Sequence, residues 1–194
     1  MSNVFIGDSV TDCDRLTFPP LGNGWVREIV NINNLQDVIN VGISGNRLVD
    51  LELRWHRDVI ENKPTRLTID IGINDMWRRY DRNEPTSVEE FEASYDNLLR
   101  ITRLNLDLEL VLCEPFLLHV RPEMKIWRED LDPKISVVHK MAAKYQAKLV
   151  KFDEMFAKLS EIEGNEIFAL DGVHPTDRGH SEMANLWISE VLNR

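Results

Sequence analysis

The chain alternates short apolar runs with longer amphipathic segments over almost its whole length, and this alternation limits the folds available to it. Five short runs, rich in branched apolar residues, have the length and composition of buried strands. Between and after them, apolar residues recur at helical spacing. The predicted strands cover 4–6, 38–41, 67–71, 108–113 and 148–152, and the predicted helices lie near 24–33, 47–61, 87–104, 133–146, 154–162 and 178–192. This order is typical of βα units around a mainly parallel sheet, so we predict an α/β fold.

Three of the predicted helices begin with recognisable capping signals. Ser87, followed three residues later by Glu90, forms a capping box, in which each side chain accepts a hydrogen bond from a free N–H group at the helix start. Asp132 followed by Pro133 predicts an N-cap and a proline at the first helical position. Pro175 and Thr176 precede the last predicted helix in a similar way. These signals agree with the helix starts that the apolar spacing predicts.

Composition and charge narrow the classes of function. With 194 residues, 43% of them hydrophobic and 29% charged, the chain has the size and composition of one globular domain, and we expect residues 1–194 to form it. The formal net charge of −10 argues against nucleic acid or an anionic membrane as the partner, because either would meet a repelling surface. A small-molecule substrate without net charge fits this surface better.

The N-terminal residues and the cysteines predict a cytoplasmic protein. The first residues contain no basic segment followed by an apolar stretch of signal-peptide length, and no run is long enough to cross a membrane. Two cysteines, Cys13 and Cys113, fit a reducing compartment. Cys13 lies four residues after Ser9 and is either a nearby reactive thiol or a half-buried bystander. The second interpretation is favoured for both cysteines.

Polar segments that contain glycine follow the predicted strands, at the edge of a parallel sheet where ligands bind. The segments after the first four strands are 7–9, 42–46, 72–75 and 114–116. In three of them a glycine accompanies serine, asparagine or aspartate. We therefore expect polar side chains and accessible backbone N–H groups to converge at this edge.

Ser9, in the segment Gly7-Asp8-Ser9, is a candidate nucleophile. A serine hydroxyl is a weak nucleophile until a base removes its proton, so Ser9 alone could equally be a helix N-cap. Near the other end, Asp171 and His174 are three residues apart in a predicted tight turn, where the carboxylate can hydrogen-bond one ring nitrogen and leave the other available as a base. The alternatives are a turn with a surface histidine and a pair of metal ligands, but no further ligands are spaced to complete a metal site. Three other histidines are interpreted as surface or structural residues: His56, His119 and His180.

Two further residues offer the hydrogen-bond donors that acyl transfer needs for its developing oxyanion. Gly45 presents a backbone N–H without a side chain to obstruct it, and Asn74 presents a side-chain amide. The N–H of Ser9 would be the third donor. The alternatives are a turn that requires positive φ at Gly45 and a local Asx turn at Asn74.

Taken together, these segments resemble, in order and spacing, the signature blocks of the SGNH/GDSL hydrolase superfamily. The resemblance runs from residue 5 to residue 187 and includes a Ser, a Gly, an Asn and an Asp-x-x-His in the expected succession. It implies that Ser9 is the nucleophile, that Asp171 orients the base His174, and that Gly45 and Asn74 complete the oxyanion hole with Ser9. It also implies a flavodoxin-like three-layer α/β/α sandwich with a five-stranded parallel sheet, and no metal or organic cofactor.

A narrower resemblance links the chain to intracellular acetylxylan esterases of bacteria that take up xylo-oligosaccharides. The similar segments are 5–13, 40–46, 53–55, 71–78 and 171–175. The similarity weakens between 115 and 132, where loops would shape the alcohol side of the pocket. Some members of that group form large rings, so the resemblance is also consistent with a homo-oligomer.

Several residues near the candidate site have a structural and a functional interpretation. Trp77 and Trp127 either wall a small acyl pocket or stack on a sugar face, or they belong to the core or to an interface. Asp8 and Asp75 are expected to hold the loops of the site by accepting backbone N–H bonds. Arg54 lies in a predicted helix, from which it could bridge to a carboxylate.

The leading hypothesis is a serine esterase that hydrolyses short-chain esters, in particular acetyl esters of sugars or oligosaccharides, through an acyl-enzyme on Ser9. A thioesterase or a lysophospholipase would use the same catalytic groups. An alternative from another class is a non-catalytic binding module, in which Ser9, Gly45 and Asn74 cradle an anion at the strand ends.

Overall fold

A parallel five-stranded sheet forms the centre of the molecule. The computed structural model describes residues 2–192. Its strands are β1 (Asn3–Gly7), β2 (Val38–Asn40), β3 (Arg66–Asp70), β4 (Glu109–Cys113) and β5 (Lys148–Val150). Their order across the sheet is β2-β1-β3-β4-β5, as in flavodoxin-like folds. Each predicted strand is present with ends within two residues of the prediction, so the predicted α/β fold is confirmed.

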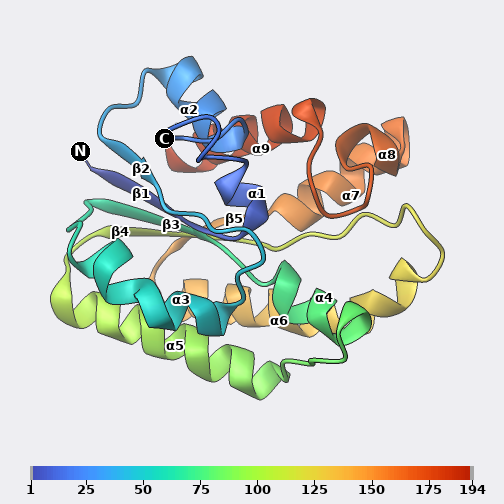
Figure 1. Ribbon diagram of the computed structural model, residues 1–194, viewed down its shortest axis with the longest axis horizontal. Helices are drawn as coiled ribbons and strands as arrows, with labels where there is room; N and C mark the ends of the chain where they lie inside the picture. The colour runs from blue at the N-terminus through green and yellow to red at the C-terminus, as the bar shows by residue number, and fades with distance from the viewer. Residues whose placement is uncertain (1, 193–194) are drawn as a thin grey trace.

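Helices cover both faces of the sheet and give the molecule three layers (Figure 1). One face carries α3 (Leu48–Trp55) with its continuation η1 (His56–Ile60), α5 (Val88–Asn105) and α6 (Met124–Tyr145). The other face carries α2 (Trp25–Asn33), α7 (Phe152–Glu163) and α9 (Asp177–Val191). The remaining helices of residues 2–192 are α1 (Ser9–Asp12), α4 (Ile73–Asp81) and α8 (Asn165–Phe168). None of the helices within residues 2–192 has the length and apolar composition that crossing a membrane would require.

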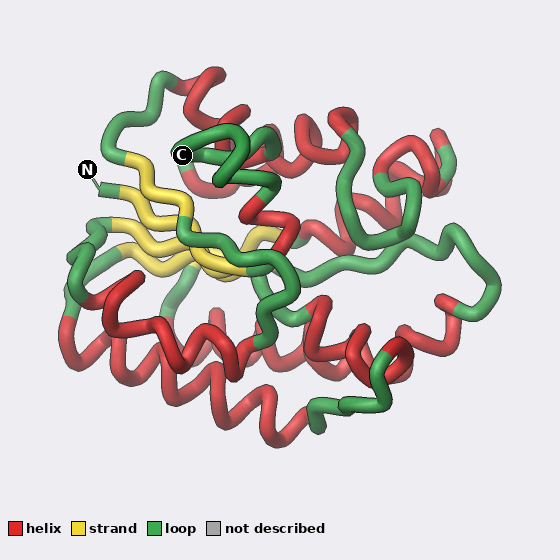
Figure 2. The backbone as a smooth tube through the Cα atoms, in the orientation of Figure 1, coloured by secondary structure: helices red, strands yellow, loops and turns green. Residues whose placement is uncertain are grey.

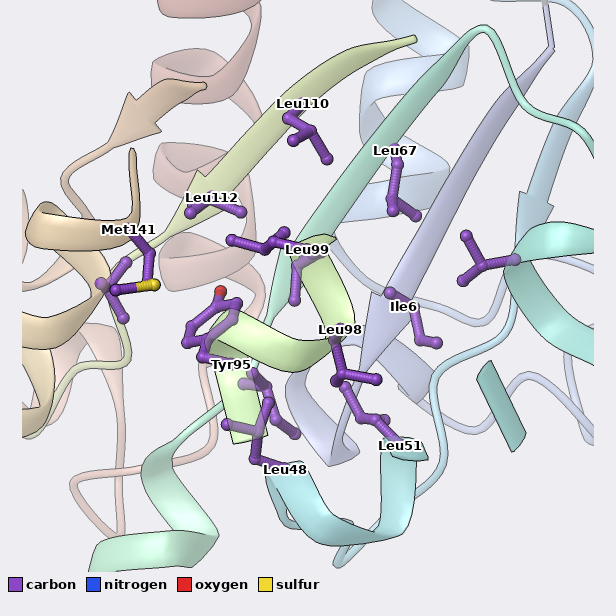
Figure 3. Close-up of a cluster of buried hydrophobic side chains, with 14 of the residues drawn as sticks. Ile6, Leu48, Leu51, Leu67, Tyr95, Leu98, Leu99, Leu110, Leu112 and Met141 are labelled. Atoms are coloured by element: carbon purple, nitrogen blue, oxygen red, sulfur yellow. The ribbon is translucent and has the colours of Figure 1, made fainter. Parts of the chain in front are cut away.

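Apolar side chains fill the space between the sheet and each helical layer. Figure 3 shows Ile6, Leu67 and Leu110 of three neighbouring strands facing helix residues such as Leu51 and Leu98. All five are at most 1% exposed. Burial of a leucine or isoleucine side chain contributes about 1.5–3 kcal/mol, so this cluster is a main source of stability. Because helices bury both faces, β1 and β4 have apolar residues at successive positions. β3 is also buried throughout, although Arg66, Thr68 and Asp70 alternate there with two apolar residues.

The start of α6 differs from the prediction. The helix begins at Met124, so Asp132 is not its N-cap and Pro133 lies in its interior. Three buried residues recur at helical spacing before the proline, namely Met124, Trp127 and Leu131. Their packing stabilises a helix that runs through Pro133, although proline lacks a backbone N–H donor. The prediction that 133 starts the helix is therefore wrong, and part of the stretch expected as loops between 115 and 132 is helical.

The carboxyl edge of the sheet brings distant segments together. The segments after β2 and β4 leave the sheet there as loops, which Figure 2 shows in green. β1 and β3 are neighbours although β2 lies between them in sequence, so chain connections diverge at this point and leave space for a ligand. Gly7 ends β1 opposite Asp70, where a Cβ at position 7 would lie 2.1 Å from the Asp70 carbonyl oxygen. Only glycine lets the two strand ends approach this closely.

Candidate active site

Ser9 is the first residue of α1 and lies two positions after the end of β1, the strand between β2 and β3. The N-cap of this helix is Asp8, whose carboxylate accepts a hydrogen bond from the Val10 N–H at 3.0 Å. The alternative interpretation of Ser9 as an N-cap is therefore wrong, and its hydroxyl is available for another partner. That partner is His174, whose Nε2 lies 2.9 Å from Ser9 Oγ.

The turn that carries His174 is closed by the carboxylate of Asp171. Asp171 Oδ1 accepts the backbone N–H groups of Val173 and His174 at 2.9 and 2.8 Å, and Oδ2 lies 2.6 Å from Nδ1 of the His174 ring. Gly172 has φ +86°, and a Cβ there would lie 2.3 Å from the carbonyl oxygen of Leu118. The turn thus needs glycine, and it orients the imidazole with Nδ1 toward the carboxylate and Nε2 toward Ser9.

These contacts shift the pKa values of both groups. Although partial burial opposes it, the hydrogen bonds from the His174 ring and from two backbone N–H groups lower the pKa of Asp171 to about 2. The hydrogen bond to Asp171 raises the pKa of His174, against the opposing effect of burial. An ionised carboxylate beside a histidine of increased basicity is the arrangement that activates a serine hydroxyl.

Gly45 and Asn74 lie on the two segments that flank this serine in the fold. Gly45, at φ +83°, occupies an exposed turn after β2, and no atom lies within 4 Å of the place where its Cβ would be. Asn74 lies in the first turn of α4 and is 2% exposed. Within residues 2–192, neither the Gly45 N–H nor the Ser9 N–H donates a hydrogen bond. Both are therefore available to an oxygen atom of a bound molecule.

The side-chain amide of Asn74 is oriented by hydrogen bonds at both of its ends. Its Nδ2 donates to the carbonyl oxygen of Asn46 at 3.1 Å, and its Oδ1 accepts from Nη2 of Arg78 at 2.6 Å. A guanidinium on the amide oxygen polarises the amide and makes its second N–H a stronger donor. Arg78 and Asn46 were not among the predicted site residues, because the helical position of Asn74 at the start of α4 was not predicted.

Three buried carboxyl groups lie under the site. Burial raises the pKa of Asp8 well above its ordinary value, and it raises the pKa of Asp70 and of Asp75 to about 7. Asp75 accepts the Leu48 N–H at 3.1 Å, and thereby links α4 to the start of α3. Asp8 and Asp75 thus both accept backbone N–H groups in the structure, at the starts of α1 and α3.

An aromatic cluster lies beside the histidine. The Trp77 ring centre is 6.0 Å from that of His174 and 6.3 Å from that of Trp127, and Tyr80 stacks on Trp127 at 5.0 Å. Trp127 is only 9% exposed, whereas Trp77 is half-buried. Trp77 is therefore the ring that a bound molecule can reach near His174, and Trp127 packs behind it. Tyr80 was not predicted, since its contact with Trp127 depends on the unpredicted helix α4.

The other singled-out residues have structural surroundings. His56 and His119 are exposed, whereas His180 is 6% exposed and hydrogen-bonded. Cys113 is buried and Cys13 is half-buried. Within residues 2–192, no group of three or more His, Cys, Asp or Glu side chains is arranged to hold a metal ion.

Comparison with known proteins assigns the family. Residues 5–181 match the model of the GDSL-like lipase/acylhydrolase family. An acetylxylan esterase of Geobacillus stearothermophilus is 34% identical over 206 residues, which cover 97% of this chain and 92% of that esterase. The chain belongs to the GDSL-like lipase/acylhydrolase family. It is an enzyme that hydrolyses carboxylic esters.

Solved structures of similar chains agree with this assignment. A variant of the Geobacillus stearothermophilus acetylxylan esterase has a TM-score of 0.88 and 32% identity, covering 97% of this chain and 93% of its own. A putative GDSL-like lipase of Parabacteroides merdae has a TM-score of 0.92 and 31% identity, covering 100% and 96%. Three structures of the Geobacillus enzyme are catalytic mutants, in which a serine, an aspartate or a histidine is replaced by alanine. That aspartate and histidine are three positions apart, the spacing of Asp171 and His174.

Proposed function

We propose that this enzyme removes acetyl groups from sugar or oligosaccharide hydroxyls through an acetyl-enzyme on Ser9. The supporting observation is the continuous hydrogen-bonded series from Ser9 Oγ to His174 Nε2, at 2.9 Å, and from His174 Nδ1 to Asp171, at 2.6 Å. Nucleophile, base and orienting carboxylate are in reach of one another without rearrangement. The similar Geobacillus protein is named for its action on acetylxylan, which supports an acetylated sugar as substrate.

In the first half of the proposed reaction, Ser9 Oγ attacks the ester carbonyl carbon while His174 Nε2 takes its proton. The carbonyl π electrons move to the oxygen, and the N–H groups of Ser9 and Gly45 and the Asn74 amide stabilise this oxyanion. When the tetrahedral intermediate collapses, the bond to the sugar oxygen breaks. The protonated His174 gives its proton to that oxygen, so the sugar leaves as an alcohol and acetyl-Ser9 remains.

The second half repeats the sequence with water as the nucleophile. His174 Nε2 removes a proton from water, and the hydroxide oxygen attacks the acetyl carbonyl carbon. The same donors stabilise the second oxyanion. Collapse breaks the bond to Ser9 Oγ, which recovers its proton from His174, and acetic acid leaves and loses its proton to water. Asp171 stays ionised throughout and stabilises the imidazolium in both halves.

The aromatic cluster supports a sugar as the alcohol part of the ester. Trp77 lies next to the His174 ring, at 6.0 Å between ring centres, and is half-buried. An apolar ring face with a polar rim is the kind of surface on which a sugar ring stacks. Trp127, which is buried, lies 6.3 Å from Trp77 between ring centres and stacks on Tyr80, so it supports the Trp77 ring from within the protein.

A covalent probe tests the nucleophile directly. A fluorophosphonate should label the wild-type protein once per chain, and Ser9→Ala should abolish the labelling. The Cys13→Ala variant is the matched control, because it changes a second potential nucleophile four residues away and should leave the labelling intact. Labelling that persists in Ser9→Ala, or a wild-type protein that is not labelled, would contradict the proposed nucleophile.

A series of aryl esters of increasing acyl length tests the acyl group. Activity should be highest with acetyl, and a maximum at long chains would instead favour a lysophospholipase or long-chain thioesterase. Acetylated xylo-oligosaccharides, compared with aryl acetates, test the alcohol part. A kcat/KM on the sugar esters no better than on aryl acetate would refute the sugar assignment.

We propose in addition that the enzyme acts in the cytoplasm. The free thiols of Cys13 and Cys113 support a reducing compartment. Fractionation of cells that express the native gene would test this location. The family resemblance is also consistent with a homo-oligomer, which light scattering on the purified protein would test.

A further inference from the structure

Arg54 is a buried arginine with a hydrogen bond from each of its three guanidinium nitrogens. It lies near the end of α3 and is 8% exposed. Its Nε donates to the side-chain oxygen of Asn46 at 2.8 Å. The remaining acceptors are the Val41 carbonyl at 2.6 Å and Asp58 Oδ2 at 2.7 Å, both from Nη1, and the Gly7 carbonyl at 3.1 Å, from Nη2.

A charge in this position is costly, and only part of the cost is offset by an ion pair. Burial lowers the pKa of Arg54, while the hydrogen bond and charge of Asp58 oppose that shift. Asp58 lies in the wide turn η1, one helical turn after Arg54. The other hydrogen bonds of Arg54 go to neutral groups, two of them backbone carbonyls. The planar guanidinium, with five N–H donors in a fixed arrangement, can serve acceptors from several segments at once, which a lysine ammonium cannot.

The neutral acceptors belong to the segments that carry the proposed oxyanion donors. Gly7 is the last residue of β1, two positions before Ser9, and its carbonyl also accepts the Ile43 N–H at 3.1 Å. Val41 begins the segment that leads to Gly45. Asn46 follows Gly45 directly. Arg54 therefore connects the end of β1 to both ends of the turn that presents the Gly45 N–H.

Asn46 extends this connection to the third donor. Its side-chain oxygen accepts from Arg54, while its backbone oxygen accepts from Asn74 Nδ2 at 3.1 Å. A displacement of Asn46 would move both its neighbour Gly45 and the acceptor that orients the Asn74 amide. Displacements of about 1 Å in such groups can reduce turnover a hundredfold.

We propose that Arg54 is a positioning residue that aligns the oxyanion donors of Ser9, Gly45 and Asn74 through Gly7, Val41 and Asn46. This inference depends on the proposed function, because those donors stabilise an oxyanion only if Ser9 attacks an ester carbonyl carbon. Arg54 itself touches neither substrate nor the reacting atoms. Its loss should weaken transition-state stabilisation and leave ground-state binding nearly unchanged.

A second buried arginine provides a matched control. Arg66, at the start of β3, is 7% exposed and donates to Glu109 at 2.6 Å and to Asn3 at 3.1 Å. It lies at the amino end of the sheet, the end opposite the site. Replacement by methionine makes the same chemical change at both positions, because it removes a buried guanidinium in each case. Asp58 keeps Arg57 as a partner at 2.6 Å, which favours folding of the Arg54→Met variant.

The experiment compares three variants with the wild type, namely Arg54→Met, Arg66→Met and Asn46→Ala. Hydrolysis of an aryl acetate gives kcat, which is expressed per fluorophosphonate-reactive site. Thermal melting gives the stability of each variant. Loss of one oxyanion donor costs about 10²–10³-fold in kcat, so a misaligned set should cost about 10–100-fold in Arg54→Met. KM should stay within about threefold, because uniform binding is not removed. Arg66→Met should melt at a lower temperature and keep a kcat within about threefold of the wild type.

The combination of Arg54→Met with Asn46→Ala tests the route. If Arg54 acts through Asn46, the double variant should lose little more activity than the worse single variant, because residues in one network are not additive. Multiplied losses in the double variant would refute this route, and a folded Arg54→Met with wild-type kcat would refute the inference. If Arg54→Met does not fold, the Asn46→Ala variant tests the inference instead. A wild-type kcat in a folded Asn46→Ala variant would also refute it. A wild-type protein without esterase activity would overturn the proposed function itself, and the inference with it.

Discussion

Two histidines near the C-terminal end, six residues apart, have opposite surroundings. His174 lies in a loop, its side chain is 46% exposed, and its ring nitrogens face a carboxylate and a serine hydroxyl. His180 lies in α9, is 6% exposed, and accepts the backbone N–H of Trp25 on Nδ1 at 3.3 Å. Its Nε2 must then carry the hydrogen, which points to Cys13 Sγ at 3.4 Å.

The difference shows what separates the proposed catalytic histidine from a structural one in this protein. The carboxylate of Asp171 raises the pKa of His174, whereas burial lowers the pKa of His180 to about 4. His174 can take up a proton near neutral pH, and the half-buried hydroxyl of Ser9 lies within hydrogen-bond distance to supply it. His180 stays neutral and joins the start of α2 to the end of α1 by two hydrogen bonds.

Replacement of each histidine by alanine should separate the two roles most strongly. His174→Ala should reduce kcat/KM by about 10⁴-fold or more, as loss of a triad member does, with little change in melting temperature. His180→Ala leaves the buried N–H of Trp25 unpaired and should cost about 1–3 kcal/mol of stability. Its kcat per reactive site should stay within about threefold of the wild type. Equal losses of activity in the two variants would contradict the comparison.

Asp171→Asn should give the next largest effect. An amide in place of the carboxylate can hold the ring of His174 in the wrong tautomer, and it cannot stabilise the imidazolium, so kcat should fall by about 10³–10⁴-fold. The variant should still bind substrate, so KM should change far less than kcat. Activity of Asp171→Asn near the wild-type value would show that the 2.6 Å contact to His174 has no part in turnover.

The pH dependence should differ between the two rings. Because the base must be neutral, kcat/KM should rise with pH around a midpoint above the ordinary histidine value of about 6.5. Ring-proton NMR should assign that midpoint to His174 and a pKa of about 4 to His180. Between about 6.5 and 4 the unfolded chain binds a proton at residue 180 that the folded chain does not. This group therefore lowers stability as the pH falls through that range, and His180→Ala should remove its contribution.

The smallest effect is expected at Cys13. Its thiol accepts a weak hydrogen bond from His180, and it is half-buried, so Cys13→Ala should change the free energy of unfolding by about 1 kcal/mol or less. Turnover should be unchanged, and treatment of the wild type with a thiol-alkylating reagent should leave kcat at its original value. Inactivation by alkylation that Cys13→Ala prevents would revive the interpretation of Cys13 as a reactive thiol.

Most of the fold could be predicted because periodicity and burial agree along the strands and most helices. The capping box at Ser87 and Glu90 is present, and Thr176 caps α9. The start of α6 could not be predicted from local signals, since Pro133 looks like a helix start and the packing of Trp127 overrides it. The single-domain prediction for residues 1–194 stays a prediction.

The candidate site residues could be predicted where their role depends on residue type and sequence spacing. The residues that orient them could not be predicted, because their contacts depend on packing in the folded chain. Asp171 and His174 are close in sequence, so their contact could be expected from their spacing. The helix α4 has no polar N-cap, because Gly72 precedes it at φ +127°, and its presence was not predicted. The neighbours that orient Asn74 from this helix, such as Arg78, were therefore missed. The hydrogen bonds of Arg54 to the carbonyl oxygens of Gly7 and Val41 join residues distant in sequence. They form only in the assembled sheet, so no local sequence pattern predicts them.

The distance along the chain between Ser9 and His174 has a consequence for biosynthesis. Ser9 is synthesised before His174, which lies 165 residues further along the chain. Until the segment with His174 has left the ribosome and folded, the hydroxyl of Ser9 lacks its contact with the imidazole. A chain that stops before His174 therefore lacks the proposed base, and its serine hydroxyl stays a weak nucleophile.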